Sequence, residues 1–243
     1  MSGHSKWSTI KRKKEKTDAQ KAKVFTKIGR EIAVIVREGG PDPSSNYKLK
    51  DVIAKDKANN VPNENIERII KKSAGGDQSQ SYEDITYEGY GPCGVAVIVE
   101  TLTDNRNRTA AEMRHYFDKY GGNLGQSGSV SFMFQRKGII AIEDSGQDED
   151  KVMEDALDAG AMDFSFDGEI FEIITGPHDL SAVRGELEAK GYKFISAEVE
   201  FVPDTFAYID SPEMQIKMGR LLEMLEDNDD VQDVWHNWEN PLD

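Results

Sequence analysis

The chain of 243 residues carries 30 Lys or Arg against 45 Asp or Glu, a formal net charge of −15, and its length suits two domains or three small ones. Its longest aliphatic runs are IAVIV at 32–36 and VAVIV at 95–99, whereas a bilayer-spanning helix needs about 20 apolar residues, so no membrane partner is expected. Cys93 is the sole cysteine, which excludes an intramolecular disulfide and indicates a reducing, cytoplasmic location.

The first 75 residues are predicted to form three short helices. Apolar residues at helical spacing predict a first helix that ends at Gly39-Gly40: Val24, Phe25, Ile28, Ile32, Ile35 and Val36. A second helix carries Leu49, Val52 and Ile53, and a third begins near Pro62 and ends at Gly75-Gly76. Residues 1–18 precede this bundle as a polar arm.

After the polar linker GGDQSQS at 75–81, the pattern changes to mixed strand and helix. GVAVIVETL is β-rich, and TAAEMRHYFDKYGG at 109–122 is typical of a helix in which Thr109 and Glu112 form a capping box. SVSFMFQ at 129–135 alternates as a strand.

A β-α-β-β-α-β series follows from residue 138, with Asp167-Gly168 as a hairpin turn. This order is the ferredoxin-like pattern. The tail adds the strand TFAYI, a helix from Pro212 with Ser211 as its N-cap, and the strand VQDVWHNW. Because a lone β-α-β tail would leave strand edges unpaired, it is predicted to pair with 95–134.

The predicted fold class is therefore α+β, with an N-terminal three-helix bundle followed by two α+β domains, the second inserted into the first. The predicted domains are a basic bundle with its arm at 1–75, a discontinuous α+β domain at 82–135 plus 204–243, and an inserted ferredoxin-like domain at 136–203.

Residues that could carry catalysis or bind metal do not form a recognisable site. The four histidines and Cys93 are scattered, without metal-ligand spacing. The acidic clusters at 144–150 and 225–233 lack calcium-loop spacing and are interpreted as solvated loops and helix ends. GYGPCG at 89–94 matches G-x-G-x-x-G but precedes a strand instead of opening a helix, so a turn is favoured. The sequence predicts no catalytic residue, metal or cofactor, and thus no enzyme.

Charge is segregated along the chain. Residues 1–75 carry 18 basic and 9 acidic residues, whereas 76–243 carry 12 and 36. A basic segment attached to an acidic body favours docking on a polyanion through the basic end. The predicted nucleic-acid contacts, with Trp7 as a base-stacking candidate, are Lys6, Trp7, Lys11, Arg12, Lys13, Lys14, Lys16, Lys21, Lys23, Lys27 and Arg30. The alternatives are a solvated tail for the charges and packing on the bundle for Trp7.

TDNRNRT at 103–109 is a candidate anion site, since guanidinium groups can join the amides at a helix N-terminus in binding an anion. The candidate residues are Asn105, Arg106, Asn107 and Arg108. The alternative is that Asp104 or another carboxylate pairs with the arginines and holds the loop.

YEGYGP at 87–92 is a second candidate. Tyr87, Glu88 and Tyr90 would shape a pocket if this segment is a loop. The alternative is a packed turn.

Five motifs resemble those of the YebC/PmpR family of probable transcriptional regulators: GHSKW at 3–7, YEGYGP at 87–92, TDNRNRT at 103–109, GGNLG at 121–125 and LEDNDDVQDVWHN at 225–237. A mitochondrial translational activator of cytochrome oxidase belongs to the same family. The resemblance implies the three-domain fold above and a cytoplasmic protein without known catalysis. One departure is Cys93, where the family usually has glycine.

The resemblance implies a DNA-binding transcriptional regulator, whereas some family members are ribosome-associated translation factors that act at proline-rich stretches. We therefore expect a non-enzymatic, nucleic-acid-binding regulator of gene expression that acts on DNA. The alternative is a factor that binds ribosomal RNA or tRNA and relieves stalling. No helix-turn-helix or zinc module is predicted, and a Lys-rich arm with one tryptophan suits structured RNA at least as well as DNA. The transcription machinery or the ribosome is the corresponding protein partner, and the acidic segment 136–203 would face solvent or a basic protein.

Overall fold

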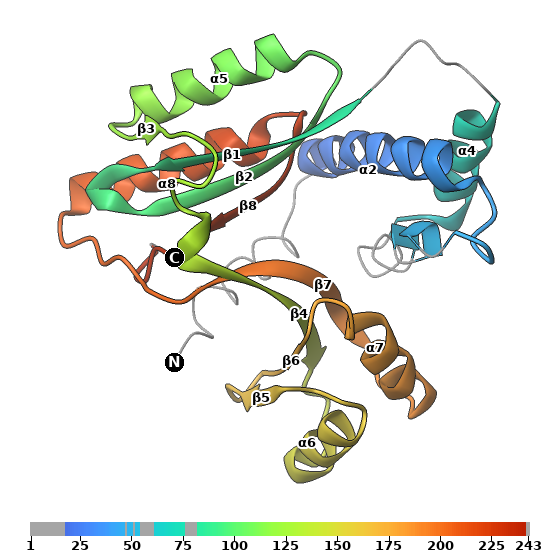
Figure 1. The fold of residues 1–243 in the computed structure, drawn as a ribbon. Helices are drawn as coiled ribbons and strands as arrows, with labels where there is room; N and C mark the ends of the chain where they lie inside the picture. The colour runs from blue at the N-terminus through green and yellow to red at the C-terminus, as the bar shows by residue number, and fades with distance from the viewer. Residues whose placement is uncertain (1–17, 47, 51, 54–60, 76–81, 242–243) are drawn as a thin grey trace. The chain divides into compact units, whose positions relative to one another are not determined.

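The computed structural model describes residues 18–46, 48–50, 52–53, 61–75 and 82–241. They form a mixed α+β protein with two four-stranded sheets (Figure 1), which confirms the α+β class; the three-helix bundle and the insertion of one α+β domain into the other stay predictions. The chain divides into two compact units, residues 1–41, 68–135 and 203–243 in one and residues 42–67 and 136–202 in the other. The domain boundaries given above stay a prediction.

The helical segments predicted before residue 75 are present where the structure describes them. Helix α2 runs over Asp18–Gly39 and helix α4 over Asn63–Ala74, and residues 48–50 and 52–53 are helical. Helix α2 buries Ile28, Ile32 and Val36, which share one face at helical spacing. It ends where Gly40 takes a φ of 85° and donates its N–H to the carbonyl of Val36 at 2.8 Å.

The sheet of the first unit has the strand order β3-β1-β2-β8, with antiparallel neighbours. Its strands are β1 (Glu83–Tyr90), β2 (Ala96–Thr103), β3 (Asn123–Leu124) and β8 (Val231–His236), with a short 3₁₀ turn η1 (Pro92–Gly94) between β1 and β2. Strand β2 is central and buried at almost every position, as its continuous apolar run indicates. Strand β8 pairs with β2, so the chain's tail completes this sheet as predicted.

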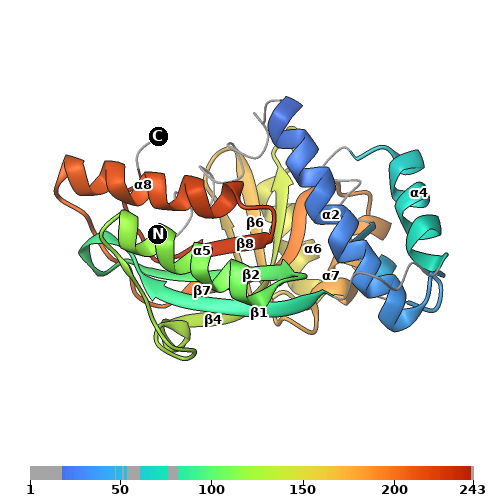
Figure 2. The same ribbon diagram turned by 90° about the horizontal axis from the view of Figure 1, so that it is seen from above.

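Helices α5 (Arg106–Lys119) and α8 (Pro212–Asp227) cover one face of this sheet (Figure 2). Helix α8 begins with Pro212 at its first position after Ser211, as the sequence predicts. A cluster of buried apolar side chains fills the core between the helices and the sheet. Its members include Val95, Val97, Val99, Met113, Phe117, Met218, Leu221, Leu222, Leu225 and Trp238.

Close backbone approach explains two glycines of the YEGYGP and GGNLG motifs. A Cβ on Gly122 would lie 2.3 Å from the carbonyl oxygen of Tyr90, and one on Gly89 would lie 2.7 Å from that of Asn123. Both distances are shorter than atoms tolerate, so any side chain here would separate β1 from β3.

The sheet of the second unit has the order β5-β6-β4-β7. Its strands are β4 (Phe134–Glu143), β5 (Asp163–Phe166), β6 (Ile170–Thr175) and β7 (Phe194–Pro203), with helices α6 (Glu149–Asp158) and α7 (Leu180–Ala189) between them. Strands β5 and β6 form the predicted hairpin, and Gly168 supplies its positive φ of 97°. Side chains from the sheet and both helices share one core, with Ile140, Ile142, Val152, Phe171, Ile173, Val183 and Leu187 among them.

A buried carboxylate connects α6 to the segment after α7. Asp155 is 5% exposed and accepts hydrogen bonds from Lys190 Nζ at 2.7 Å, Tyr192 Oη at 2.8 Å and Lys151 Nζ at 3.1 Å. The hydrogen bond from Lys190, followed by that from Tyr192, holds the pKa of Asp155 well below its ordinary value. Burial and the bond to Asp155 raise the pKa of Tyr192 to about 12.

Replacing Asp155 by asparagine should lower the free energy of unfolding by about 1–3 kcal/mol, since the amide cannot accept all three hydrogen bonds. The folded-state pKa of Asp155 is depressed, so its contribution is complete above the unfolded value and disappears as the pH falls through the folded value. Urea denaturation at pH 7 and pH 3 measures this. A variant as stable as wild type at pH 7 would contradict the anchoring role.

Cys93, which stands where the family usually has glycine, has a strained backbone conformation. Cys93 has φ 57° and is the one non-glycine residue with positive φ in the described ranges, and its side chain is exposed. Because an L-residue pays about 1–2 kcal/mol in this region and glycine does not, Cys93→Gly should raise the free energy of unfolding by up to about 1 kcal/mol. Urea denaturation measures the change. Cys93→Ala keeps the Cβ and is the control; equal gains in both variants would exclude relief of strain.

Two predicted strands are wrong. Within SVSFMFQ, Ser131–Met133 form the 3₁₀ turn η2 and β4 begins at Phe134, because a buried carboxylate of β1 binds the backbone amides just before and within this turn. In TFAYI, Ala207 alone makes an isolated bridge, to Trp238. A local alternation of apolar residues cannot reveal either long-range constraint.

Candidate nucleic-acid interface

The predicted nucleic-acid contacts fall on both sides of the start of the described residues. Nine of the candidate side chains cannot be placed: those of Lys6, Trp7, Lys11, Arg12, Lys13, Lys14 and Lys16 lie outside the described residues, and Lys21 and Lys23 are described as helical backbone of α2 alone. Lys27 and Arg30 are the candidates whose side chains the structure describes. Nucleic-acid binding by these residues stays a prediction.

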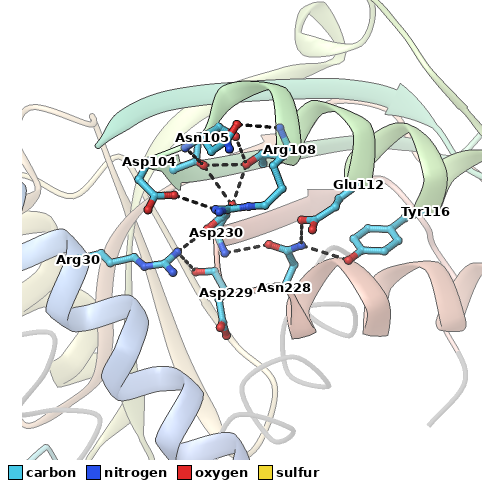
Figure 3. Close-up of polar contacts among 11 residues, drawn as sticks. Arg30, Asp104, Asn105, Arg108, Glu112, Tyr116, Asn228, Asp229 and Asp230 are labelled. Carbon is cyan, nitrogen blue, oxygen red and sulfur yellow. Dashed lines mark hydrogen bonds and ion pairs between the residues drawn. The ribbon is translucent and has the colours of Figure 1, made fainter. Parts of the chain in front are cut away.

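Lys27 and Arg30 contact the carbonyl end of α8 and the residues that follow it. Lys27 Nζ donates to the carbonyl of Glu226 at 2.8 Å, where a cation also meets the negative end of the helix dipole. Arg30 Nη1 donates to the carbonyl of Asp229 at 2.7 Å and to Asp230 Oδ1 at 2.6 Å (Figure 3). The basic helix α2 is therefore attached to the acidic tail through two of its predicted nucleic-acid contacts.

Asp230 is the centre of this attachment. It is 3% exposed, and its second oxygen, Oδ2, accepts hydrogen bonds from Arg108 Nη2 at 2.6 Å, Thr109 Oγ1 at 2.7 Å and Thr103 Oγ1 at 3.1 Å. Burial alone would raise the pKa of Asp230, but the hydrogen bonds from Arg108, Thr109 and Arg30 hold it below its ordinary value. The carboxylate is thus charged and shared by two arginines at neutral pH.

The TDNRNRT motif supplies these partners because α5 starts inside it. Asn105 is the N-cap, and its side-chain oxygen accepts the N–H of Arg108 at 3.1 Å. The capping box predicted from Thr109 is therefore wrong. Thr109 lies in the first turn, is fully buried and donates its hydroxyl toward Asp230 and the backbone of Asn105.

A second contact holds the tail at the same place. Asn228 accepts the N–H of Asp230 through Oδ1 at 2.8 Å and donates from Nδ2 to Glu112 Oε2 at 2.8 Å and to Tyr116 Oη at 3.2 Å (Figure 3). Together with the contacts of Asp230 to Thr103, Arg108 and Thr109, these bonds join α5 and the motif at 103–109 to the motif at 225–237, more than 100 residues later.

Only one arginine of the candidate anion site takes part in these contacts. Arg108 pairs with Asp104 at 2.9 Å as well as with Asp230, so for this arginine the structure shows the carboxylate pairing that was the alternative. Arg106 and Asn107 are exposed at the start of α5. An anion site formed by Arg106 and its neighbours stays a prediction.

The residues of the candidate pocket belong to strand β1 and not to a loop. Glu88 is 5% exposed, and its carboxylate accepts the N–H groups of Gly128, Val130 and Ser131, each at 2.8 Å. Burial raises the pKa of Glu88, but these three hydrogen bonds outweigh it, so the pKa lies below its ordinary value. The carboxylate therefore faces backbone amides and not an open cavity.

The hydroxyl groups of Tyr87 and Tyr90 differ in their hydrogen bonding. Tyr90 donates its hydroxyl to the carbonyl of Ser129 at 3.0 Å. The Tyr87 hydroxyl lies buried with no hydrogen-bond partner among the described residues, and burial raises its pKa. Whether the three side chains bind a ligand stays a prediction.

Sequence reasoning missed the two carboxylates that organise this unit. The sequence predicts the whole cluster at 225–233 to be solvated; Glu226, Asp227 and Asp229 are exposed, but Asp230 is buried. The available signal was the position of Asp230 directly before the apolar start of β8, where a side chain turns inward. The cluster at 144–150 is largely exposed, as predicted, and Asp148 caps α6.

Within the described part of the chain, no group of three or more His, Cys, Asp or Glu side chains is arranged to hold a metal ion. The helices it contains include none that is long and apolar enough to cross a membrane.

Fold and site together define a two-sheet α+β protein in which a basic helix is attached to a buried aspartate of an acidic tail. Sequence models of the TACO1/YebC N-terminal domain and of the TACO1/YebC second and third domain match residues 5–76 and 82–238. The chain therefore belongs to the TACO1/YebC family, which confirms the resemblance drawn from its motifs.

Relatives at high identity are each named probable transcriptional regulatory protein. One from Acetivibrio thermocellus is 62% identical over 98% of this chain and 99% of its own length, and one from Caldicellulosiruptor bescii is 61% identical over 98% of both chains. A crystal structure of a conserved hypothetical protein from Aquifex aeolicus is 44% identical, with a TM-score of 0.83 over 94% of each chain.

Proposed function

We propose that this protein is a non-enzymatic regulator of gene expression that binds nucleic acid through its basic segment 1–75, and that its physiological target is DNA. The observation that carries the proposal is the segregation of charge, with an excess of nine basic residues before residue 76 and of 24 acidic residues after it. The regulatory names of its relatives agree with it. Binding without catalysis fits the absence of a recognisable catalytic constellation in the sequence.

The fold that this proposal assumes is a helical bundle at 1–75, a discontinuous α+β domain at 82–135 plus 204–243 and an inserted domain at 136–203. In such an arrangement the acidic domains stay clear of phosphates, because their net charge repels a polyanion. They remain available for a protein of the transcription machinery, in the cytoplasm.

The second candidate is a ribosome-associated translation factor that binds ribosomal RNA or tRNA. The feature that favours it is the arm itself, where four consecutive basic residues at 11–14 follow a single Trp7 and no groove-reading helix-turn-helix is predicted.

Gradient sedimentation of cell lysate, untreated or treated with DNase or RNase, tests the proposal. We expect the protein to sediment with nucleic acid and to move to the top of the gradient after DNase. Release of the protein from ribosomal fractions by RNase would contradict DNA as the target and favour the second candidate, a ribosome-associated translation factor. Sedimentation as a free protein without nuclease treatment would contradict nucleic-acid binding.

A further inference from the structure

A loop between β3 and β4, at residues 125–133, is bound to strand β1 through its backbone. Glu88 accepts three of its backbone N–H groups, and a fourth N–H, that of Gly125, donates to the Glu88 carbonyl at 2.8 Å. Tyr90 adds a hydrogen bond to the carbonyl of Ser129. One buried, charged side chain thus fixes the backbone of the loop at three positions, since hydrogen bonds to an ionised acceptor are among the stronger ones.

This fixed loop presents an aromatic side chain to solvent. Phe132 is 73% exposed, the largest fraction among the exposed large hydrophobic side chains in the described ranges. Its apolar neighbours in the sequence, Val130 and Phe134, are 0% and 7% exposed. The 3₁₀ turn η2 therefore turns Val130 and Phe134 inward while Phe132 points out. A single exposed apolar residue is ordinary, but one held on a preorganised loop suggests a binding role.

The loop also belongs to a stretch of sequence without acidic residues, although the exposed Asp204 lies beside it and donates its backbone N–H to the carbonyl of Met133 at 2.8 Å. Residues 119–142 form the longest run without Asp or Glu in the whole chain, 24 residues with Lys119, Arg136 and Lys137 as their charges. The surrounding segment 76–243 carries 36 acidic residues. The exposed side chains within this run include Gln126, Ser127 and Gln135, which are neutral hydrogen-bonding groups. A polyanion is therefore not repelled by the loop's own residues.

We propose that the loop at 125–133 is a second nucleic-acid contact, in which the ring of Phe132 stacks on an unpaired nucleobase. A flat aromatic side chain on a loop whose own exposed polar residues are neutral hydrogen-bonding groups is the chemistry that single-stranded nucleic acid meets on its protein partners. The inference rests on the proposed function and adds to it a contact for bases where the basic segment supplies contacts for phosphates. A hydrophobic pocket on a partner protein is the competing occupant.

Fluorescence anisotropy of the full chain with labelled oligonucleotides tests this. The probes are one 20-nucleotide sequence as single-stranded RNA, as single-stranded DNA and as DNA duplex. Phe132→Ala should weaken binding to the single strands by about 5- to 150-fold and to the duplex by less than twofold, because a paired base is not free to stack. Comparison of the two single strands shows whether RNA or DNA supplies the base.

Three controls keep the result specific. Phe132→Trp should restore the affinity, because it restores a stacking face. Tyr208→Ala, which removes another aromatic side chain that is 59% exposed, should leave the affinity unchanged. The slope of log affinity against log salt should be the same for Phe132→Ala and wild type, since the substitution leaves every phosphate contact in place.

Equal affinity of Phe132→Ala and wild type for the single strands would overturn the inference, and so would loss of a protein partner with nucleic-acid binding intact. In both cases the proposed function would stand. Absence of binding by the wild type to all three probes would overturn the proposed function itself.

Discussion

Asp230→Asn is expected to lower the free energy of unfolding by about 2–4 kcal/mol, as measured by urea denaturation at pH 7. Asp230 accepts from Arg30, Arg108, Thr103 and Thr109 with both oxygens, and an amide can accept through one oxygen only. The substitution therefore removes one of the two accepting oxygens and the charge that two arginines share. Because Arg30 would no longer hold α2 to this carboxylate, the linker after α2 should also become a faster target for limited proteolysis.

The effect should depend on pH with a defined sign. The folded-state pKa of Asp230 is lower than the unfolded value, so its stabilisation is complete above the unfolded value, about 4, and disappears as the pH falls through the folded value. The difference between wild type and Asp230→Asn should therefore shrink at acid pH. Asp229→Asn is the matched control, because the side chain of Asp229 is exposed and its contact with Arg30 uses the backbone carbonyl. Equal stability of both variants would exclude Asp230 as the organising group.

Charge reversal of the N-terminal arm is expected to have a large effect on nucleic-acid binding. Replacing Lys11, Arg12, Lys13 and Lys14 by glutamate removes up to four phosphate contacts. The slope of log affinity against log salt should fall by about 0.7–0.9 for each phosphate that the arm no longer neutralises, so affinity at low salt falls steeply while melting temperature is unchanged. Anisotropy titrations between 50 and 300 mM salt (roughly a sixfold range) measure both quantities.

Reversal of Lys193 and Arg220 is the control for net charge. Both side chains are exposed and belong to the acidic segment. The loss of affinity is compared per reversed charge. If it is the same for this double variant and for the arm variant, the arm has no special role and the proposal that the basic segment binds nucleic acid is wrong.

The strands and helices that the sequence predicts well are those whose burial is continuous or periodic over many residues. Strand β2 was recognisable because VAVIVE is apolar on both faces, and the β5–β6 hairpin because Asp167-Gly168 suits a tight turn. The prediction of strands over SVSFMFQ and TFAYI is wrong for a physical reason. Glu88 binds the backbone of the first from a different strand, and no spacing rule contains that information.

The candidate site was predictable in its charges but not in its contacts. Composition separates the basic segment from the acidic one, which favours a polyanion ligand. It does not show that Lys27 and Arg30 also bind the tail, because their acceptors follow about 200 residues later. Likewise, Asp230 looks like its solvated neighbours in the sequence and differs from them only in that β8 starts with the next residue.

Ultraviolet crosslinking of the full-length protein to bound nucleic acid, followed by peptide mass spectrometry, tests the central claim most directly. The account predicts that crosslinked peptides come mainly from the basic segment 1–75, above all from residues 6–30, with a second set from 125–133. The acidic segment 144–203 should yield few, because its net charge repels phosphates. A crosslink pattern dominated by 144–203, with the basic segment unmodified, would contradict the account.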